Sequence, residues 1–260
     1  MTNNRRIFIG IAISFGIMIA AALYILAVIM LTSPTAPPRR NPTSVQATIT
    51  PTPSNFTPEA VLATPIPGDP AQVLGTPDSK DTFDNANNWH LYDNACFTSE
   101  ITGGKYLMTA KGLPGVLCWE VTNTVVKDFY LETYYQNPPN CLLDDRYGIF
   151  FRTPDNQRGY LFGISCDGRY MLTKWDGHTN ETIIPGTASD QISFEPSQIN
   201  RIGVLGQGSH FRLYANGTLL MDVDDGAFPG PGKIGYFIQS SNNQKYSVTF
   251  DNLSVWNLPK

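Results

Sequence analysis

The chain has 260 residues, with 18 Lys and Arg against 22 Asp and Glu, and so a formal net charge of −4 at pH 7. A nucleic-acid-binding protein needs a basic face, and this composition offers none, so nucleic acid is excluded as a partner. The length allows a domain with a sizeable core.

The first element is an uncharged apolar run, Ile7–Leu31. About 20 apolar residues at about 1.5 Å rise cross the hydrocarbon core of a bilayer. A cleaved signal peptide is the alternative, but its apolar region is usually only about 7–15 residues long. The chain also continues as Thr32-Ser33-Pro34-Thr35, without an A-x-A-like cleavage site. The run therefore predicts a retained transmembrane helix, a signal anchor.

Charges on either side of this run predict its orientation. Arg5 and Arg6 precede it directly, whereas Arg39 and Arg40 lie further away on the other side. The closer pair and the short tail of residues 1–6 favour an N-terminus in the cytoplasm. We expect a single-pass protein of the cell membrane whose C-terminal domain is extracytoplasmic.

Residues 32–78 form a Pro/Thr-rich segment with the stretches SPTAPP, TPTPSNFTP and TPIPGDP. Such a composition buries too little apolar surface to offset chain entropy, and Pro favours extended polyproline II. The segment predicts a disordered linker. A stalk carrying O-linked glycans is the alternative.

The pattern changes at residue 79. From there to residue 260, short apolar runs alternate with turn signals at roughly 8–12-residue spacing, which is typical of an all-β sandwich. The expected strands are Trp89–Tyr92, Phe97–Ile101, Lys105–Ala110, Val116–Thr122, Phe129–Gln136, Tyr147–Arg152, Tyr160–Ser165, Tyr170–Trp175, Ile202–Leu205, Phe211–Ala215, Leu219–Val223, Lys233–Ile238 and Tyr246–Trp256.

Two dipeptides, Asp167-Gly168 and Asn216-Gly217, predict two-residue type I′ hairpins. The first would set Ile164 opposite Met171. Alternation along the strands then divides the side chains between two faces. The expected core face holds Tyr147, Ile149, Phe151, Tyr160, Phe162, Ile164, Met171, Phe129, Leu131 and Thr133. The other face holds Tyr130, Glu132, Tyr134, Arg152, Tyr170 and Lys174.

The chain has four cysteines, and no two of them are spaced as C-x-x-C: Cys96, Cys118, Cys141 and Cys166. An even count beyond a membrane anchor suggests two disulfides with three possible connectivities. The hairpin register places Cys166 opposite about residue 145, within reach of Cys141. This leaves Cys96 to pair with Cys118. Four buried thiols are the alternative.

The segment YGIFFRTPDNQRGYLFGISCDGRYMLTKWDG, residues 147–177, resembles the concanavalin A-like lectin/glucanase superfamily. Within it, the segment is most similar to laminin-G-like and 3-keto-disaccharide hydrolase-type domains of bacterial surface proteins. LYANGTLLMDVDD, GKIGYFI and FDNLSVW continue the pattern downstream. The resemblance implies a jelly-roll β-sandwich that often binds ligands on a concave face. It does not imply one function, because the superfamily includes lectins, glycosidases and adhesive modules.

Catalytic residues are not recognisable. Glucanases of the superfamily carry carboxylates at alternate positions of one strand, where they flank a glycosidic bond. Here Glu120 and Glu132 stand alone on their strands. In 3-keto-disaccharide hydrolase-type domains, the strand after the FFR hairpin usually carries polar residues that face the groove. In this chain the corresponding residues are Leu161 and Gly163, which are not polar. The sequence therefore predicts no catalytic site.

No cofactor is expected, with one exception: the resemblance implies a structural Ca²⁺ where the first and last strands meet. Asp81 or Asp84 with Asp251 would supply the carboxylate oxygens. The three histidines lack the spacing of zinc ligands.

The candidate ligand-binding residues are Tyr130, Glu132, Tyr134, Arg152, Tyr170 and Lys174, with Trp175 at the rim. Aromatic rings stack on sugar faces, and charged groups hydrogen-bond hydroxyls. The alternative is that these rings are covered by packing. Trp89, Trp119 and Trp256 are expected in the core. The sequence thus predicts a membrane-anchored carbohydrate-binding module. A glycan-acting hydrolase and a protein-binding or sensory ectodomain are the alternatives.

Overall fold

A computed structural model describes residues 68–259. The predicted transmembrane segment 7–31, and the linker as far as residue 67, lie outside the described residues. Within 68–259, no helix combines the length and the apolar character that crossing a bilayer requires.

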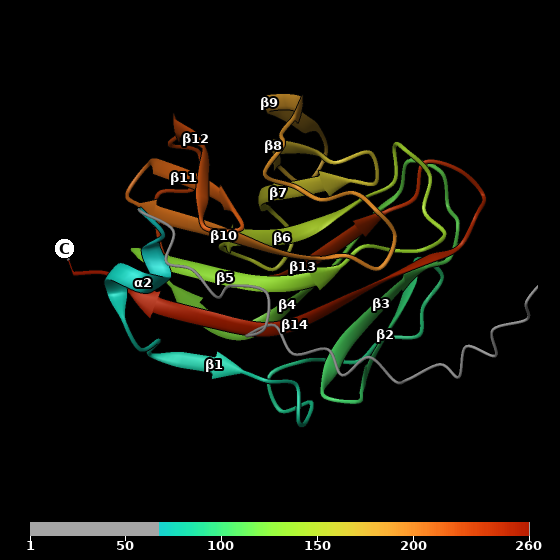
Figure 1. The fold of residues 1–260 in the computed structure, drawn as a ribbon, viewed down its shortest axis with the longest axis horizontal. Coiled ribbons are helices and arrows are strands. Elements are labelled where there is room, and N and C mark those ends of the chain that lie inside the picture. The colour runs from blue at the N-terminus through green and yellow to red at the C-terminus, as the bar shows by residue number, and fades with distance from the viewer. Residues whose placement is uncertain (1–67, 260) are drawn as a thin grey trace, which may run out of the picture. The chain divides into compact units, whose positions relative to one another are not determined.

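The described chain is all-β, as predicted, and forms two antiparallel sheets that pack face to face as a sandwich (Figure 1). Sheet A has the order β12 (Thr218–Asp224), β11 (His210–Ala215), β10 (Ile199–Gln207), β5 (Phe129–Gln136), β14 (Tyr246–Asn257), β3 (Lys105–Ala110), β2 (Phe97–Thr102), and β1 (Ser79–Asp81) also pairs with β14. Sheet B has the order β4 (Leu117–Val126), β13 (Gly232–Gln239), β6 (Arg146–Thr153), β7 (Gly159–Ser165), β8 (Arg169–Trp175), β9 (Asn180–Ala188).

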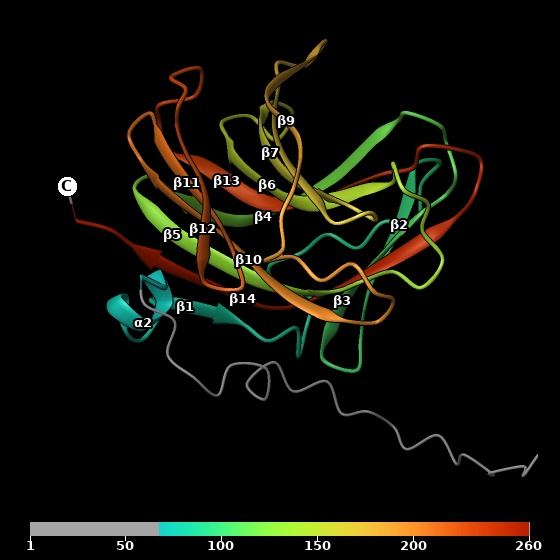
Figure 2. The same ribbon diagram turned by 45° about the horizontal axis from the view of Figure 1, so that its top comes forward.

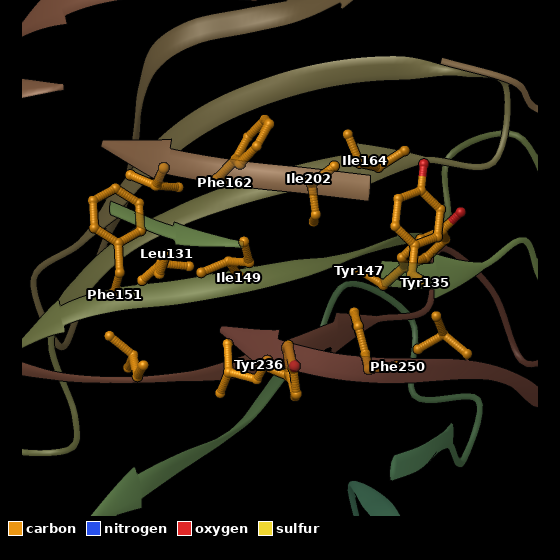
Figure 3. Close-up of a cluster of buried hydrophobic side chains, with 14 of the residues drawn as sticks. Leu131, Tyr135, Tyr147, Ile149, Phe151, Phe162, Ile164, Ile202, Tyr236 and Phe250 are labelled. Atoms are coloured by element: carbon orange, nitrogen blue, oxygen red, sulfur yellow. The ribbon is translucent and has the colours of Figure 1, made fainter. Parts of the chain in front are cut away.

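Between the sheets lies a core rich in aromatic rings (Figure 3). The inward faces of β6 and β7 contribute the side chains expected from their alternation, including Ile149, Phe151 and Phe162, all at most 1% exposed. From the other strands, Tyr236 and Phe250 stack with ring centroids 3.9 Å apart. Close packing of this kind makes the core sensitive to loss of even a few atoms.

Strand positions agree with the sequence in most places, but three differ. Trp89–Tyr92, expected as a strand, is a loop. Two edge strands were not expected: β1 is very short, and β9 contains Pro185, a residue that lowers strand propensity and is confined to edges.

The hairpin between β7 and β8 corrects the predicted register. Ile164 pairs with Tyr170, not with Met171. The turn is one residue longer than expected, because Gly168 N donates to Ser165 O at 2.9 Å and Gly168 adopts a φ of 79°. A slip of one residue turns every side chain to the other face. Tyr170 and Leu172 therefore join the core between the sheets, whereas Met171, which is also buried, lies on the other face of sheet B. The Asn216-Gly217 hairpin has the expected register, with Ala215 opposite Thr218.

Strand β14 contains a bulge that changes which side chains face outward. Its register against β5 shifts between Asp251 and Ser254, and Asn252 adopts a left-handed φ of 52°. Before the bulge Phe250 faces the core, and after it Val255 does. Regular alternation from Phe250 would place Trp256 in the core. The bulge instead directs Trp256 to the outer face of sheet A.

The folded unit begins before the expected boundary at residue 79. Helix α2 (Pro70–Leu74) lies beside the C-terminal end of β14 (Figures 1 and 2). Its Ala71 and Leu74 pack on an outer cluster of sheet A formed by Tyr130, Tyr214 and Trp256. Residues 68–78, which the sequence assigned to the linker, thus belong to the domain.

Both expected disulfides are present. Cys96 is bonded to Cys118, and Cys141 to Cys166. The first joins the residue before β2 to β4, and so links the two sheets. The second ties the β5–β6 loop to the β7–β8 turn.

Candidate functional site

The predicted binding residues do not share one face, because β5 belongs to sheet A whereas β6 and β8 belong to sheet B. Tyr130, Glu132 and Tyr134 point to the outer face of sheet A, as their alternation predicted. Tyr130 and Glu132 are buried there, at 1% and 5% exposure. Helix α2 covers this part of the face, which the sequence did not reveal because α2 lies in the Pro/Thr-rich segment.

Beneath α2, the buried charges form a network around Arg201. Arg201 Nη2 contacts Asp69 Oδ2, and Nη1 lies 3.1 Å from Glu132 Oε2. The hydroxyl of Tyr130 donates to Glu132 at 2.9 Å. Burial raises the pKa of Glu132, although Arg201 opposes the shift. The network shows that Tyr130 has a packing role.

The prediction that Arg152 lies on the ligand-binding face is also wrong. Arg152 has a φ of 54°, which turns its side chain inward, and it is 1% exposed. Its guanidinium lies over the rings of Phe129 and Phe211 and donates to backbone carbonyls of Gly208, Pro229 and Gly230. Such a group holds loops together and leaves almost none of its own surface for a ligand.

On β8, the corrected register moves two more candidates. Tyr170 lies in the core, and its hydroxyl donates to Leu220 O at 3.2 Å. The side chain of Lys174 lies on the same face of β8 as Tyr170. Its ammonium group forms ion pairs with Asp225 at 3.0 Å and with Glu181 at 3.3 Å. Only Trp175 of the β8 candidates lies on the open face of sheet B.

That open face carries an aromatic surface that we call the tryptophan platform: Trp119, Trp175, Leu117 and Val121, half-buried and packed on Phe150, Leu161 and Phe237. The ring centroids of Trp119 and Trp175 lie 6.4 Å apart. Trp119 was expected in the core. It faces outward because it alternates with Cys118 and Glu120, whose side chains are buried. Its Nε1 donates to Asn156 O at 2.9 Å, which fixes the ring.

Beside Trp119, a pocket of about 130 Å³ opens at the edge of β4. His90, Tyr92, Asn123, Asn156 and Lys233 line it together with Trp119, Glu120 and Val121. Glu120 is the one carboxylate in this lining, and burial raises its pKa. Its Oε2 accepts from Ser99 and Tyr106. Glycosidases use two carboxylates, and this lining contains one.

A larger cleft of about 260 Å³ lies on the opposite side of the sandwich, between α2 and sheet A. Glu132 and Tyr134, two of the predicted binding residues, line it. The remaining lining comes from Ala71, Gly75, Pro77, Lys80, Asn252, Ser254 and Trp256.

The residues expected to bind Ca²⁺ do lie near the meeting point of the first and last strands, since Asp81 pairs with Leu253. Both oxygens of Asp81 accept hydrogen bonds from protein donors, namely Phe83 N, Asn88 Nδ2 and Trp89 Nε1. Within residues 68–259, no three His, Cys, Asp or Glu side chains are grouped so as to hold a metal. These side chains thus give the calcium hypothesis no support, and it stays a prediction.

Comparison with solved structures places this geometry among known folds. The carbohydrate binding module CBM66 from Bacillus subtilis superposes with a TM-score of 0.52 at 17% identity, covering 66% of this chain and 98% of that one. The β-glucanase of Bacillus licheniformis gives a TM-score of 0.52 at 13% identity, covering 71% and 99%. A protein of unknown function with a galectin-like fold from Bacillus subtilis gives a TM-score of 0.51 at 9% identity, covering 70% of this chain and 96% of that one.

No family model matches the chain, and the search of curated proteins found no relative. The structural likeness nevertheless shows that the chain has the fold of the concanavalin A-like lectin/glucanase superfamily, as its sequence suggested.

Proposed function

We propose that this protein is a membrane-anchored, extracytoplasmic carbohydrate-binding module with a jelly-roll fold, and that its ligand binds on the tryptophan platform. The single observation that carries the proposal is the pair of half-buried indoles, Trp119 and Trp175, on an open sheet face. The two ring planes are inclined at 53°, and each partly exposed ring face can stack on the apolar face of a sugar ring.

Polar groups around the platform supply what stacking lacks. Asn123, Asn156 and Lys233 line the pocket beside Trp119 and offer both donors and acceptors for hydroxyl groups. The neighbouring folds add support, since one is a carbohydrate binding module and one a β-glucanase. Binding is favoured over hydrolysis because the pocket lining contains one carboxylate, Glu120.

A glycan array tests the proposal directly. The full chain is kept in a detergent whose head group is not a sugar, because alkyl glycosides would compete for the site. We expect retention of at least one glycan class, and a loss of about tenfold or more in affinity for Trp119→Ala and Trp175→Ala, equivalent to about 1.4 kcal/mol.

Phe194→Ala is the matched control, because Phe194 is an aromatic residue 59% exposed outside the platform. It should leave glycan affinity unchanged. If no glycan binds, or if the tryptophan variants bind as well as the native chain, the platform is not a carbohydrate site. A hydrolysis assay on the retained glycans separates binding from catalysis.

A further inference from the structure

The cleft beneath α2 contains a row of three polar side chains that comes from three adjacent strands. Lys80 of β1 pairs with Ser254 of β14, and Ser254 pairs with Glu132 of β5. Neighbouring strands lie about 4.8 Å apart, so the backbones of Lys80 and Glu132 are separated by about 10 Å. All three side chains line the cleft.

The bulge in β14 builds this row. It holds Asn252 in a left-handed conformation, which is costly for a residue other than glycine, and it turns Ser254 and Trp256 outward. Strained residues and bulges are frequent where a strand redirects side chains toward a functional site. Here their product is a cleft with one aromatic wall and several polar groups.

The two charged side chains that line the cleft, Glu132 and Lys80, differ in their ion-pair partners. Glu132 is paired with Arg201 and accepts from Tyr130. Lys80 is exposed and forms no hydrogen bond or ion pair through its ammonium group within residues 68–259. The positive charge of Lys80 lowers the pKa of Asp251, a carboxyl that is 6% exposed, and Lys105 has the same effect on it. Of the two charged side chains that line the cleft, Lys80 is thus the one whose charged group makes no direct contact within the described residues and is open to a ligand.

From this arrangement we infer that the α2 cleft is a second ligand site, which takes a small hydroxylated carboxylate of the size of one sugar acid. The ligand's carboxylate pairs with Lys80. Ser254 and Asn252, whose side chains make no hydrogen bond within the described residues, bind its hydroxyl groups. Trp256 and Tyr134 supply apolar contact, and the wall formed by Ala71, Gly75 and Pro77 closes the site.

This site is separate from the tryptophan platform, because the cleft lies on sheet A and the platform on sheet B. It also includes part of the segment that joins the domain to the preceding chain. A ligand in the cleft contacts both α2 and the sheet, and so it should stabilise the docking of α2.

The experiment uses the full chain in the same detergent and four probes: glucuronate, galacturonate, glucose and galactose. Isothermal titration calorimetry and thermal unfolding are measured for each probe. We expect at least one uronate to bind about tenfold or more tightly than its neutral counterpart and to raise the unfolding temperature, because the ion pair with Lys80 is charge-assisted.

Lys80→Gln removes the charge from an exposed position and should abolish the preference for the uronate without lowering the unfolding temperature of the free protein. Lys105→Gln is the matched control, since Lys105 also acts on Asp251 but does not line the cleft. Trp119→Ala reports on the platform. Uronate binding that survives Trp119→Ala and Lys105→Gln but not Lys80→Gln supports the inference.

Three results would overturn it: no uronate binding to the native chain, equal affinity for uronates and neutral hexoses, or uronate binding that is lost in Trp119→Ala and kept in Lys80→Gln. None of these bears on whether a glycan binds the platform, which the array decides independently.

Discussion

Asp69 and Arg201 form an ion pair in which both side chains are almost completely buried, although the two residues lie far apart in the chain. Asp69 also caps α2, because its Oδ1 accepts from Ala71 N at 3.2 Å. The pair joins the start of the described chain to β10 of sheet A.

We predict that Asp69→Ala lowers the free energy of unfolding by about 2–3 kcal/mol. Breaking a buried pair typically costs about 3–5 kcal/mol, but Glu132 still neutralises Arg201 in the variant. Urea denaturation followed by tryptophan fluorescence measures the change. Asp93→Ala is the control, because Asp93 is 81% exposed in its pair with Lys111 and should cost no more than about 1 kcal/mol. Equal losses in the two variants would contradict the role of Asp69.

Arg152→Ala and Tyr170→Ala should behave as core variants. Both side chains are buried and hydrogen-bonded to backbone carbonyls. We expect each to lose about 2–5 kcal/mol of stability, comparable to about 3–5 kcal/mol for Phe162→Ala. Tyr134→Phe, at a half-buried position, should change stability by less than about 1 kcal/mol. Urea denaturation distinguishes the groups, and stable Arg152→Ala protein would refute the inward orientation.

Asp251 should make the domain more stable in mild acid than at neutral pH. Burial raises the pKa of Asp251 to about 6, with Asp84 adding to the shift and Lys105 and Lys80 opposing it. Between these two pKa values, the Asp251 carboxyl keeps its proton in the folded state, whereas in the unfolded state, with an ordinary pKa of 3.8, it has released it. This contribution is fully present below about pH 4 and is lost as pH rises through about 6.

The stability that the protonated Asp251 carboxyl contributes in acid, and that is lost at neutral pH, amounts to about 2–3 kcal/mol of unfolding free energy. Asp251→Asn should thus be more stable than the native chain at pH 7.5 and equal to it near pH 4. Unfolding free energies measured at several pH values in this range test the sign. A native chain that gains stability between pH 4 and pH 7 relative to Asp251→Asn would reverse the prediction.

The Cys141–Cys166 bridge holds a loop to a turn, and we expect the Cys141→Ser/Cys166→Ser double variant to lose about 2–5 kcal/mol. Peptide mapping without reductant, on protein isolated from its native source, should show this bridge and Cys96–Cys118. Free thiols at all four positions would contradict both.

Strand alternation predicted the buried face of β5, β6 and β7, because each strand packs one side against the core and the pattern survives in the sequence. It failed at β8 because Asp-Gly also fits a turn with one more residue, and a single residue inverts the strand. It failed at Arg152, where a local change in backbone direction outweighs alternation. Before residue 79, Asp69-Pro70 carries the N-cap and N1 residues of a helix start. The signal was missed because it lies in a Pro-rich segment, and because so short a helix depends on packing against Trp256 and Tyr130.

The same dependence explains why the binding surface was misjudged. Exposure of Tyr130 and Glu132 was inferred from the outward face of β5, but a face is open only if no other segment covers it. Trp119 shows the reverse case: its large apolar side chain suggested burial, and its position on the edge strand β4 leaves it half-exposed.

The Asp69–Arg201 pair also decides how the domain would respond to force. Any pull transmitted along the chain before Gly68 reaches the sandwich first at α2, and only afterwards at β1, which is held by pairing to β14. Peeling α2 away would uncover Trp256 and open the cleft while both sheets stay intact. We therefore expect α2 to detach before either sheet unfolds, with the Asp69–Arg201 pair as the main resistance to that first step.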